Sequence, residues 1–170
     1  MKGAVRCMAA LALLTCGSAL LATPAADPFV GTWILNVEKS TYPPGTYPKS
    51  MVIEMETLEG GGVRYRSATV YSNGATSTAR YAAKYDGQEV PVQGSRRLLL
   101  PVSLKRLDAN TVVAAYKRGF RVVATSRREV SRDGRTMTIT TTSPNQAGKN
   151  VTIVGVYQKK PLQARPGQGK

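Results

Sequence analysis

The chain has 170 residues and a formal net charge of +14, from 24 Lys and Arg against 10 Asp and Glu, and it contains no histidine. The absence of histidine excludes Ser-His-Asp and Cys-His nucleophilic machinery and any histidine-ligated zinc site. A basic surface of this kind attracts anions in general. Its basic residues occur as scattered pairs, however, and no run of five or six predicts a specific nucleic-acid site.

The first 26 residues have the pattern of an export signal. Two basic residues precede an uncharged run over 7–22, and small residues suited to cleavage follow up to Ala26. We therefore expect 1–26 to be a removed signal peptide and the protein to be periplasmic or secreted. A lipid anchor on Cys16 is the weaker alternative, because Thr15 stands where a lipobox has Gly or Ala.

Both cysteines, Cys7 and Cys16, lie inside this segment, so the mature chain would have no disulfide and no thiolate metal site. It would keep a net charge of +12, from 22 basic and 10 acidic residues. A chain of about 140 residues can bury one substantial core. We expect one domain over 27–160, followed by a disordered basic tail over 161–170 that contains two Pro and two Gly.

Turn residues divide the remaining chain at intervals of about nine to fifteen residues. Between them lie runs rich in Val, Thr, Tyr and Ile, the residues that favour strands. The expected strands are near 30–36, 50–57, 63–71, 76–84, 88–93, 99–107, 111–117, 120–130, 135–142 and 150–158. This spacing, without an amphipathic helix, predicts a single antiparallel up-and-down β-barrel of about eight to ten strands. Closure would bring the first and last strands together and remove exposed sheet edges.

The first expected strand carries the only tryptophan, Trp33, just before a Pro-rich crossing over 38–50. We interpret Trp33 as a core residue that plugs the floor of the barrel. In the next strand Glu54 and Glu56 alternate with apolar residues. Their face is therefore the solvated outer one, where a pair of catalytic carboxylates would not be enclosed.

The strand near 120–130 offers a polar group for the interior. Its smaller and more apolar face consists of Val122, Ala124, Ser126, Arg128 and Val130. We expect this face to point inward, which would bury Arg128, with Trp33 as a stacking partner. A buried Arg requires an anionic partner or several hydrogen bonds. That partner is either a ligand carboxylate or phosphate, with Tyr157 assisting, or a structural group such as a carbonyl cluster or Asp108.

Tyrosines on strands or strand ends are further candidates for lining a pocket, although half-buried strand tyrosines are common without a ligand. They are Tyr65, Tyr81, Tyr85 and Tyr116. From all these groups we select Arg128, Tyr157, Trp33, Tyr116 and Tyr65 as the candidate ligand-binding residues. We expect no catalytic residue, no metal site and no cofactor.

The motif "FVGTWILN" at 29–36 resembles the opening strand of the calycin barrels, the lipocalins and fatty-acid-binding proteins. In those families the Trp of Gly-x-Trp plugs the closed end. The chain is still more similar to a bacterial group of secreted lipocalin-like proteins. The shared motifs are "GTWILN", "AKYDG" with "PVQG", "SLKRLDANT" and "SRDGRTMTIT". The fatty-acid-binding proteins hold a carboxylate with Arg-x-Tyr on the last strand, where this chain has Gly155-Val156-Tyr157.

The resemblance implies an exported, non-enzymatic barrel that binds a small apolar or amphipathic molecule, including anionic ones. The alternative is an envelope or interaction protein with a filled barrel, which binds anionic surfaces through its basic exterior. The expected oligomeric state is a monomer.

Overall fold

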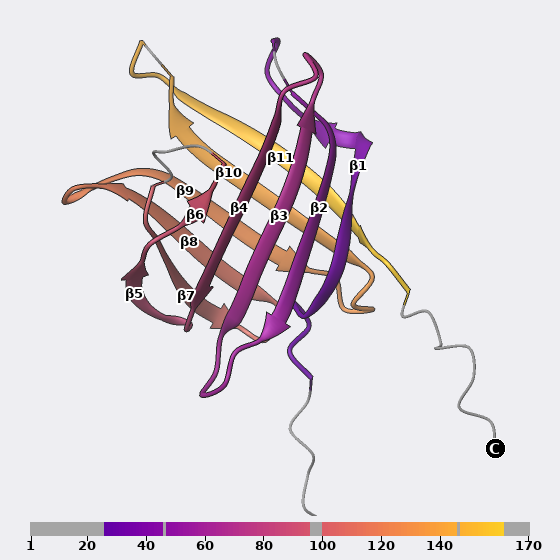
Figure 1. The fold of residues 1–170 in the computed structure, drawn as a ribbon, viewed down its shortest axis with the longest axis vertical. Coiled ribbons are helices and arrows are strands. Elements are labelled where there is room, and N and C mark those ends of the chain that lie inside the picture. The colour runs from indigo at the N-terminus through magenta and orange to yellow at the C-terminus, as the bar shows by residue number, and fades with distance from the viewer. Residues whose placement is uncertain (1–25, 46, 96–99, 146, 162–170) are drawn as a thin grey trace, which may run out of the picture.

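The first and last strands lie side by side in one curled antiparallel sheet (Figure 1). The structure is a computed structural model that describes residues 26–45, 47–95, 100–145 and 147–161. The predicted signal peptide, apart from Ala26, and the predicted tail beyond Pro161 lie outside the described residues. The sheet is all-β, as the sequence predicts. No helix in the described ranges is long and apolar enough to cross a membrane.

Eleven strands form in the described part of the chain. They are β1 (Gly31–Thr41), β2 (Pro48–Thr57), β3 (Val63–Tyr71), β4 (Thr76–Ala83), β5 (Asp86–Val90), β6 (Gln93–Gly94), β7 (Val102–Asp108), β8 (Thr111–Arg118), β9 (Arg121–Val130), β10 (Thr136–Pro144) and β11 (Asn150–Lys159). Their order across the sheet is β5-β7-β8-β9-β10-β11-β1-β2-β3-β4-β6. The predicted meeting of the first and last strands is confirmed, since Leu35 of β1 pairs with Tyr157 of β11.

The sheet departs from a simple meander between β4 and β7. Two strands, β5 and β6, replace the single strand expected near 88–93, and they lie at opposite margins of the sheet. Val90 of β5 pairs with Val102 of β7. Gln93 of β6 pairs with Arg80 of β4. Pro91 lies between β5 and β6 and has no backbone N–H with which to continue a ladder. The chain therefore changes partner strand at this point, which we call the seam.

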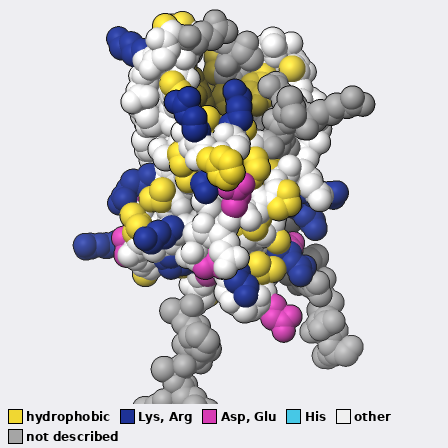
Figure 2. Space-filling view, turned by 90° about the vertical axis from the view of Figure 1, so that its left-hand side faces the viewer, with side chains coloured by type: hydrophobic (Ala, Val, Ile, Leu, Met, Phe, Trp, Pro, Cys, Tyr) yellow, Lys and Arg dark blue, Asp and Glu magenta, His cyan; other side chains and the backbone are white. Residues whose placement is uncertain are grey.

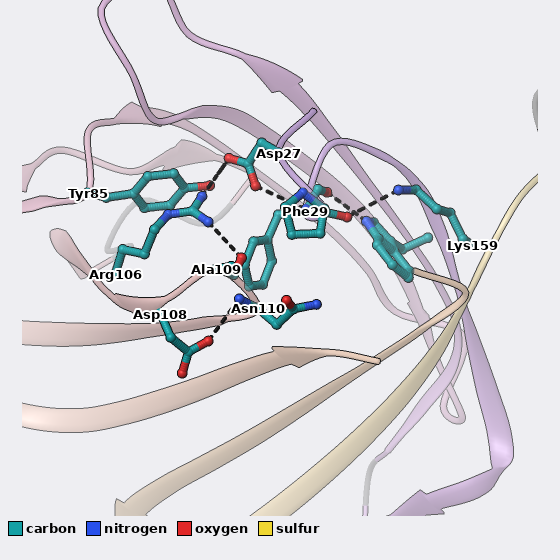
Figure 3. Close-up of polar contacts among 10 residues, drawn as sticks. Asp27, Phe29, Tyr85, Arg106, Asp108, Ala109, Asn110 and Lys159 are labelled. Atoms are coloured by element: carbon teal, nitrogen blue, oxygen red, sulfur yellow. Dashed lines mark hydrogen bonds and ion pairs between the residues drawn. The ribbon is translucent and has the colours of Figure 1, made fainter. Parts of the chain in front are cut away.

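The closed end of the barrel is built by the segment just before β1, which crosses the floor (Figure 3). Trp33 is fully buried, and its Nε1 donates a hydrogen bond of 2.8 Å to the carbonyl oxygen of Phe29. Asp27 fixes the same segment: its Oδ2 lies 2.6 Å from Arg106 Nη2 and accepts a 2.8 Å hydrogen bond from the Tyr85 hydroxyl. The predicted floor position of Trp33 agrees with this arrangement.

Two details of the floor differ from the sequence expectation. The cation over the Trp33 ring is Lys159, whose Nζ lies 4.9 Å from the ring centroid, and not Arg128. Strand pairing explains the difference, because Lys159 is the cross-strand neighbour of Trp33. Tyr85 belongs to the floor, where its ring lies 4.0 Å below the Arg106 guanidinium carbon, and not to a pocket lining.

The opposite end carries the turns β3–β4, β8–β9 and β10–β11 together with the crossing after β1, and we call it the open end. The crossing packs onto this rim: Ser72 donates its backbone N–H to the Tyr47 carbonyl oxygen at 2.8 Å. Tyr42 and Tyr47 stack with centroids 6.3 Å apart. Figure 2 shows the upper end of the molecule hollowed, with hydrophobic side chains inside the hollow and Lys or Arg side chains at its edge.

A bulge in the β8–β9 hairpin changes the predicted facing of one residue. Tyr116 pairs with Ala124, but Lys117 pairs with Val122, so Val123 is an extra residue in β9. The alternation shifts by one place there. Val122 is consequently exposed, whereas the sequence pattern predicts it on the inner face.

The turn before β3 offers a matched test of the fold. Gly61 and Gly62 both have positive φ, of 91° and 107°. A Cβ on Gly61 meets open space, whereas one on Gly62 would overlap the backbone of Ala83 in β4. We expect Gly61→Ala to cost about 1 kcal/mol in the free energy of unfolding and Gly62→Ala to cost at least about 3 kcal/mol. Urea denaturation measures both variants, and equal losses would contradict the close approach of Gly62 to β4.

Candidate functional site

Arg128 of β9 points into the barrel, and it is the one charged residue that is buried in the described part of the chain. Alternation along β9 explains its direction, because Ser126, Arg128 and Val130 are all buried on the inner face. The neighbours Arg127 and Glu129 face solvent, where they form an ion pair of 2.9 Å. The inward orientation predicted for Arg128 is therefore what the structure has.

The Arg128 guanidinium spans the barrel interior to reach hydroxyl groups on other strands. Its Nη1 donates to the Tyr81 hydroxyl oxygen at 2.8 Å, and its Nη2 donates to the Tyr116 hydroxyl oxygen at 3.3 Å. Its Cζ lies 5.3 Å from the centroid of the Tyr65 ring. Six places in the sheet order separate β9 from β4, so the bond to Tyr81 joins distant walls of the barrel.

Tyr65 and Tyr81 form a stacked pair beneath this cation. The β3–β4 register places them directly opposite each other, with ring centroids 4.6 Å apart and an interplanar angle of 10°. The register depends on the turn, in which Tyr71 donates its backbone N–H to the Ala75 carbonyl and Gly74 has a φ of 81°. A turn one residue shorter would slip the pairing and turn one of the two rings outward.

Tyr157 lies on the wall next to this group, at 4% exposure. Its ring folds back over Gly155, where a Cβ would lie 2.9 Å from the ring atom Cε2. Its hydroxyl donates to Met51 Sδ at 3.3 Å. In the Arg-x-Tyr motif of the fatty-acid-binding proteins, the Arg would occupy the position of Gly155 in β11. Gly155 and Arg128 both pair with Ile139 of β10. The guanidinium of Arg128 therefore lies in the same row across the sheet, but it comes from β9.

Four of the five predicted site residues thus lie in the interior, and the fifth, Trp33, lies apart in the floor. Sequence reasoning missed Tyr81 as the nearest partner of Arg128. The signal was present, because Tyr81 alternates with Ala79 and Ala83 on one strand face. We call Arg128, Tyr65, Tyr81, Tyr116 and Tyr157 the interior cluster.

The interior cluster carries an uncompensated positive charge. Burial raises the pKa of Tyr65, Tyr81 and Tyr157, although the nearby Arg128 acts to lower it. These hydroxyls therefore stay neutral at ordinary pH. Within the described ranges no carboxylate pairs with Arg128, and its buried Nε has no hydrogen-bond partner. Asp108, the structural partner considered from the sequence, is instead exposed at the end of β7.

Two grooves lie along β3, β4 and the seam. One has a volume of about 550 Å³ and the other about 410 Å³, and both are lined by Arg66, Arg80 and Gln93. The smaller groove also contacts Tyr65 and Tyr81, so the stacked pair is approached from the seam. The described residues contain no group of three or more His, Cys, Asp or Glu that could hold a metal ion.

Comparison with known proteins places the fold. No family model matches the chain. No curated protein matches it either. Among solved structures, the wild-type fluorescent protein UnaG is similar with a TM-score of 0.51 and 16% identity, covering 78% of this chain and 97% of UnaG. A zebrafish ileal bile acid-binding protein in complex with cholic acid gives 0.45 and 12%, covering 78% and 99%. The fold is of the calycin type seen in fatty-acid-binding-protein-like barrels.

The buried tyrosines predict a loss of stability in alkali. In the unfolded chain Tyr65, Tyr81 and Tyr157 ionise near the ordinary pKa of 10.0, whereas the folded protein keeps their protons at higher pH. The contribution of these three tyrosines to the free energy of unfolding is complete below about pH 10, where both states are protonated. It is lost as the pH rises from there through the raised pKa values of the folded protein. We expect the free energy of unfolding, measured with urea, to fall continuously above about pH 10. The fall should be shallower in Tyr81→Phe, and identical slopes would contradict the assignment.

Proposed function

We propose that the barrel binds a small amphipathic molecule whose anionic group pairs with Arg128. The observation that carries this proposal is the buried guanidinium, which has tyrosine hydroxyls around it and an orphaned Nε. Removing a cation from water without a counter-charge costs several kcal/mol. A ligand carboxylate or phosphate would supply the counter-charge and accept the hydrogen bond that Nε leaves unmade.

The apolar body of the ligand would lie against the inner wall. Met51, Ile139 and Tyr157 present apolar surface there, and the hollow at the open end contains further hydrophobic side chains (Figure 2). Small-molecule sites commonly combine an apolar lining with a few convergent polar groups. A barrel of this size holds one small ligand. Arg128 would be the anchor, with Tyr81 and Tyr116 fixing its direction.

We propose a binding role without catalysis or a cofactor. Guanidinium and tyrosine groups of this kind orient an anion but provide no nucleophile with an adjacent base. Trp33 would act in the floor and not on the ligand. We further propose that the protein belongs with the secreted bacterial lipocalin-like proteins that its motifs resemble, that it is exported after removal of 1–26, and that it acts in the periplasm or outside the cell as a monomer.

The test compares Arg128→Met with Arg127→Met, its outward-facing neighbour on the same strand. Native mass spectrometry of protein purified without denaturation from a periplasmic extract should show a co-purifying mass in the wild type. We expect Arg127→Met to retain that mass and Arg128→Met to lose it, with affinity for the extracted molecule reduced at least about 30-fold. Retention of the mass and affinity in Arg128→Met would exclude Arg128 as the anchor.

Stability separates binding from a purely structural role of Arg128. Removal of an Arg that is paired with a buried carboxylate costs about 3–5 kcal/mol in the free energy of unfolding, because the carboxylate is left without its counter-charge. An Arg without a counter-charge in the free protein should leave the free energy of unfolding unchanged or raise it, because Met fills similar volume without desolvating a charge. Urea denaturation of ligand-free Arg128→Met measures this, and a large loss would favour the structural role.

A further inference from the structure

Charge is distributed unequally between the two ends of the barrel. All four aspartates of the chain lie at the closed end, together with Glu59 of the β2–β3 turn. The described residues at the rim of the open end are 42–45, 47–50, 70–76, 117–122, 143–145 and 147–150, and we call them the open rim. These residues include no Asp or Glu, and the carboxylate of Glu89 in β5 reaches the rim only at Lys117, with which it pairs. The basic residues of the open rim are Lys49, Lys117, Arg118, Arg121 and Lys149.

Exposed apolar side chains gather at the same end. Six large hydrophobic side chains are exposed in the described part of the chain, and four of them belong to the open rim. The four are Tyr47, Val70, Phe120 and Val122. Phe120 is fully exposed at the tip of the β8–β9 hairpin, and the bulge at Val123 turns Val122 outward beside it.

The hairpin tip has an arrangement that is unfavourable in water alone. Arg118 and Arg121 pair directly across the hairpin, on either side of Gly119 and Phe120. Like charges directly opposite each other destabilise a hairpin. Neither Arg has an ion-pair partner among the described residues, whereas the adjacent Lys117 pairs with Glu89 at 3.2 Å. An anionic surface that also accepts an aromatic ring would reduce the repulsion between the two Arg side chains and remove the Phe120 ring from water.

We propose that the open rim is a docking surface for a lipid bilayer that contains anionic lipids. Phe120 and Val122 would enter the interface between headgroups and acyl chains, while Arg118, Arg121, Lys49 and Lys149 contact lipid phosphates. The acidic residues at the closed end orient the barrel with its mouth toward the bilayer. The hollow edged by Lys and Arg side chains then faces the membrane (Figure 2).

Docking in this orientation is independent of the ligand site but consistent with it. Tyr116, which accepts a hydrogen bond from Arg128, precedes the hairpin tip on the same strand. A molecule leaving the bilayer would therefore reach the interior cluster without crossing bulk water. The proposal does not require this transfer, because it is carried by the charges and exposed side chains of the open rim.

Co-flotation with vesicles tests the docking surface. Vesicles of phosphatidylcholine with about one third phosphatidylglycerol should carry the wild-type protein, and vesicles of phosphatidylcholine alone should not. Arg118→Glu combined with Arg121→Glu should weaken binding at least about 25-fold, since each basic residue near such a leaflet contributes about fivefold. Phe120→Ser should weaken it about tenfold, through the loss of apolar burial.

Matched variants at the closed end serve as controls. Arg132→Glu combined with Arg135→Glu makes the same charge change, and Leu107→Ser removes an exposed apolar side chain that is also distant from the open rim. Both should bind like the wild type. Equal losses in the open-end and closed-end variants, unchanged binding of Phe120→Ser, or no binding of the wild type would each overturn the proposal. Arg128→Met should bind vesicles like the wild type. The vesicle experiment can therefore succeed or fail independently of the proposed ligand site.

Discussion

The pairing of β1 with β11 is the constraint on which the rest of the structure depends. It joins strands from the two ends of the domain, and without it both strands would be exposed edges. The same ladder places Lys159 against Trp33 and Tyr157 against Leu35, so one set of hydrogen bonds builds both the floor and part of the inner wall. The loop-closure entropy of so distant a contact is offset by burial of the Trp33 and Tyr157 rings.

The interior that results has two chemically different zones. Toward the closed end, Phe29, Trp33, Ile53 and Leu104 are fully buried and provide an apolar core. Further up, the guanidinium of Arg128 faces tyrosine hydroxyls that remain protonated. Arg128 thus lies outside the apolar part of the core, and no carboxylate pairs with it in the described part of the chain. An internal counter-ion would make the site more stable and less receptive to an anion.

The sequence predicts much of this fold because its determinants are local. Alternation identifies the strands and places Arg128 on the inner face, and the Trp33 motif identifies the floor. The remaining features depend on contacts that no local pattern contains. Tyr81 meets Arg128 only because the sheet curls until β4 faces β9, and Lys159 replaces Arg128 above Trp33 through the β1–β11 register. Val122 faces outward because β9 contains one extra residue. The strand expected near 88–93 is divided at Pro91, and its two halves, β5 and β6, pair at opposite margins of the sheet.

Both ends of the folded chain leave the barrel on the same side. The chain enters at Asp27, which is fixed to Arg106 in the floor, and β11 ends at Lys159 above Trp33. Figure 1 shows both ends of the described chain departing from the lower part of the molecule, away from the hollowed end. A polypeptide joined directly to Asp27 or to Pro161 would therefore begin at the back of the barrel, away from the mouth. Fusions at both ends and immobilisation through either one are accordingly compatible with access to the interior.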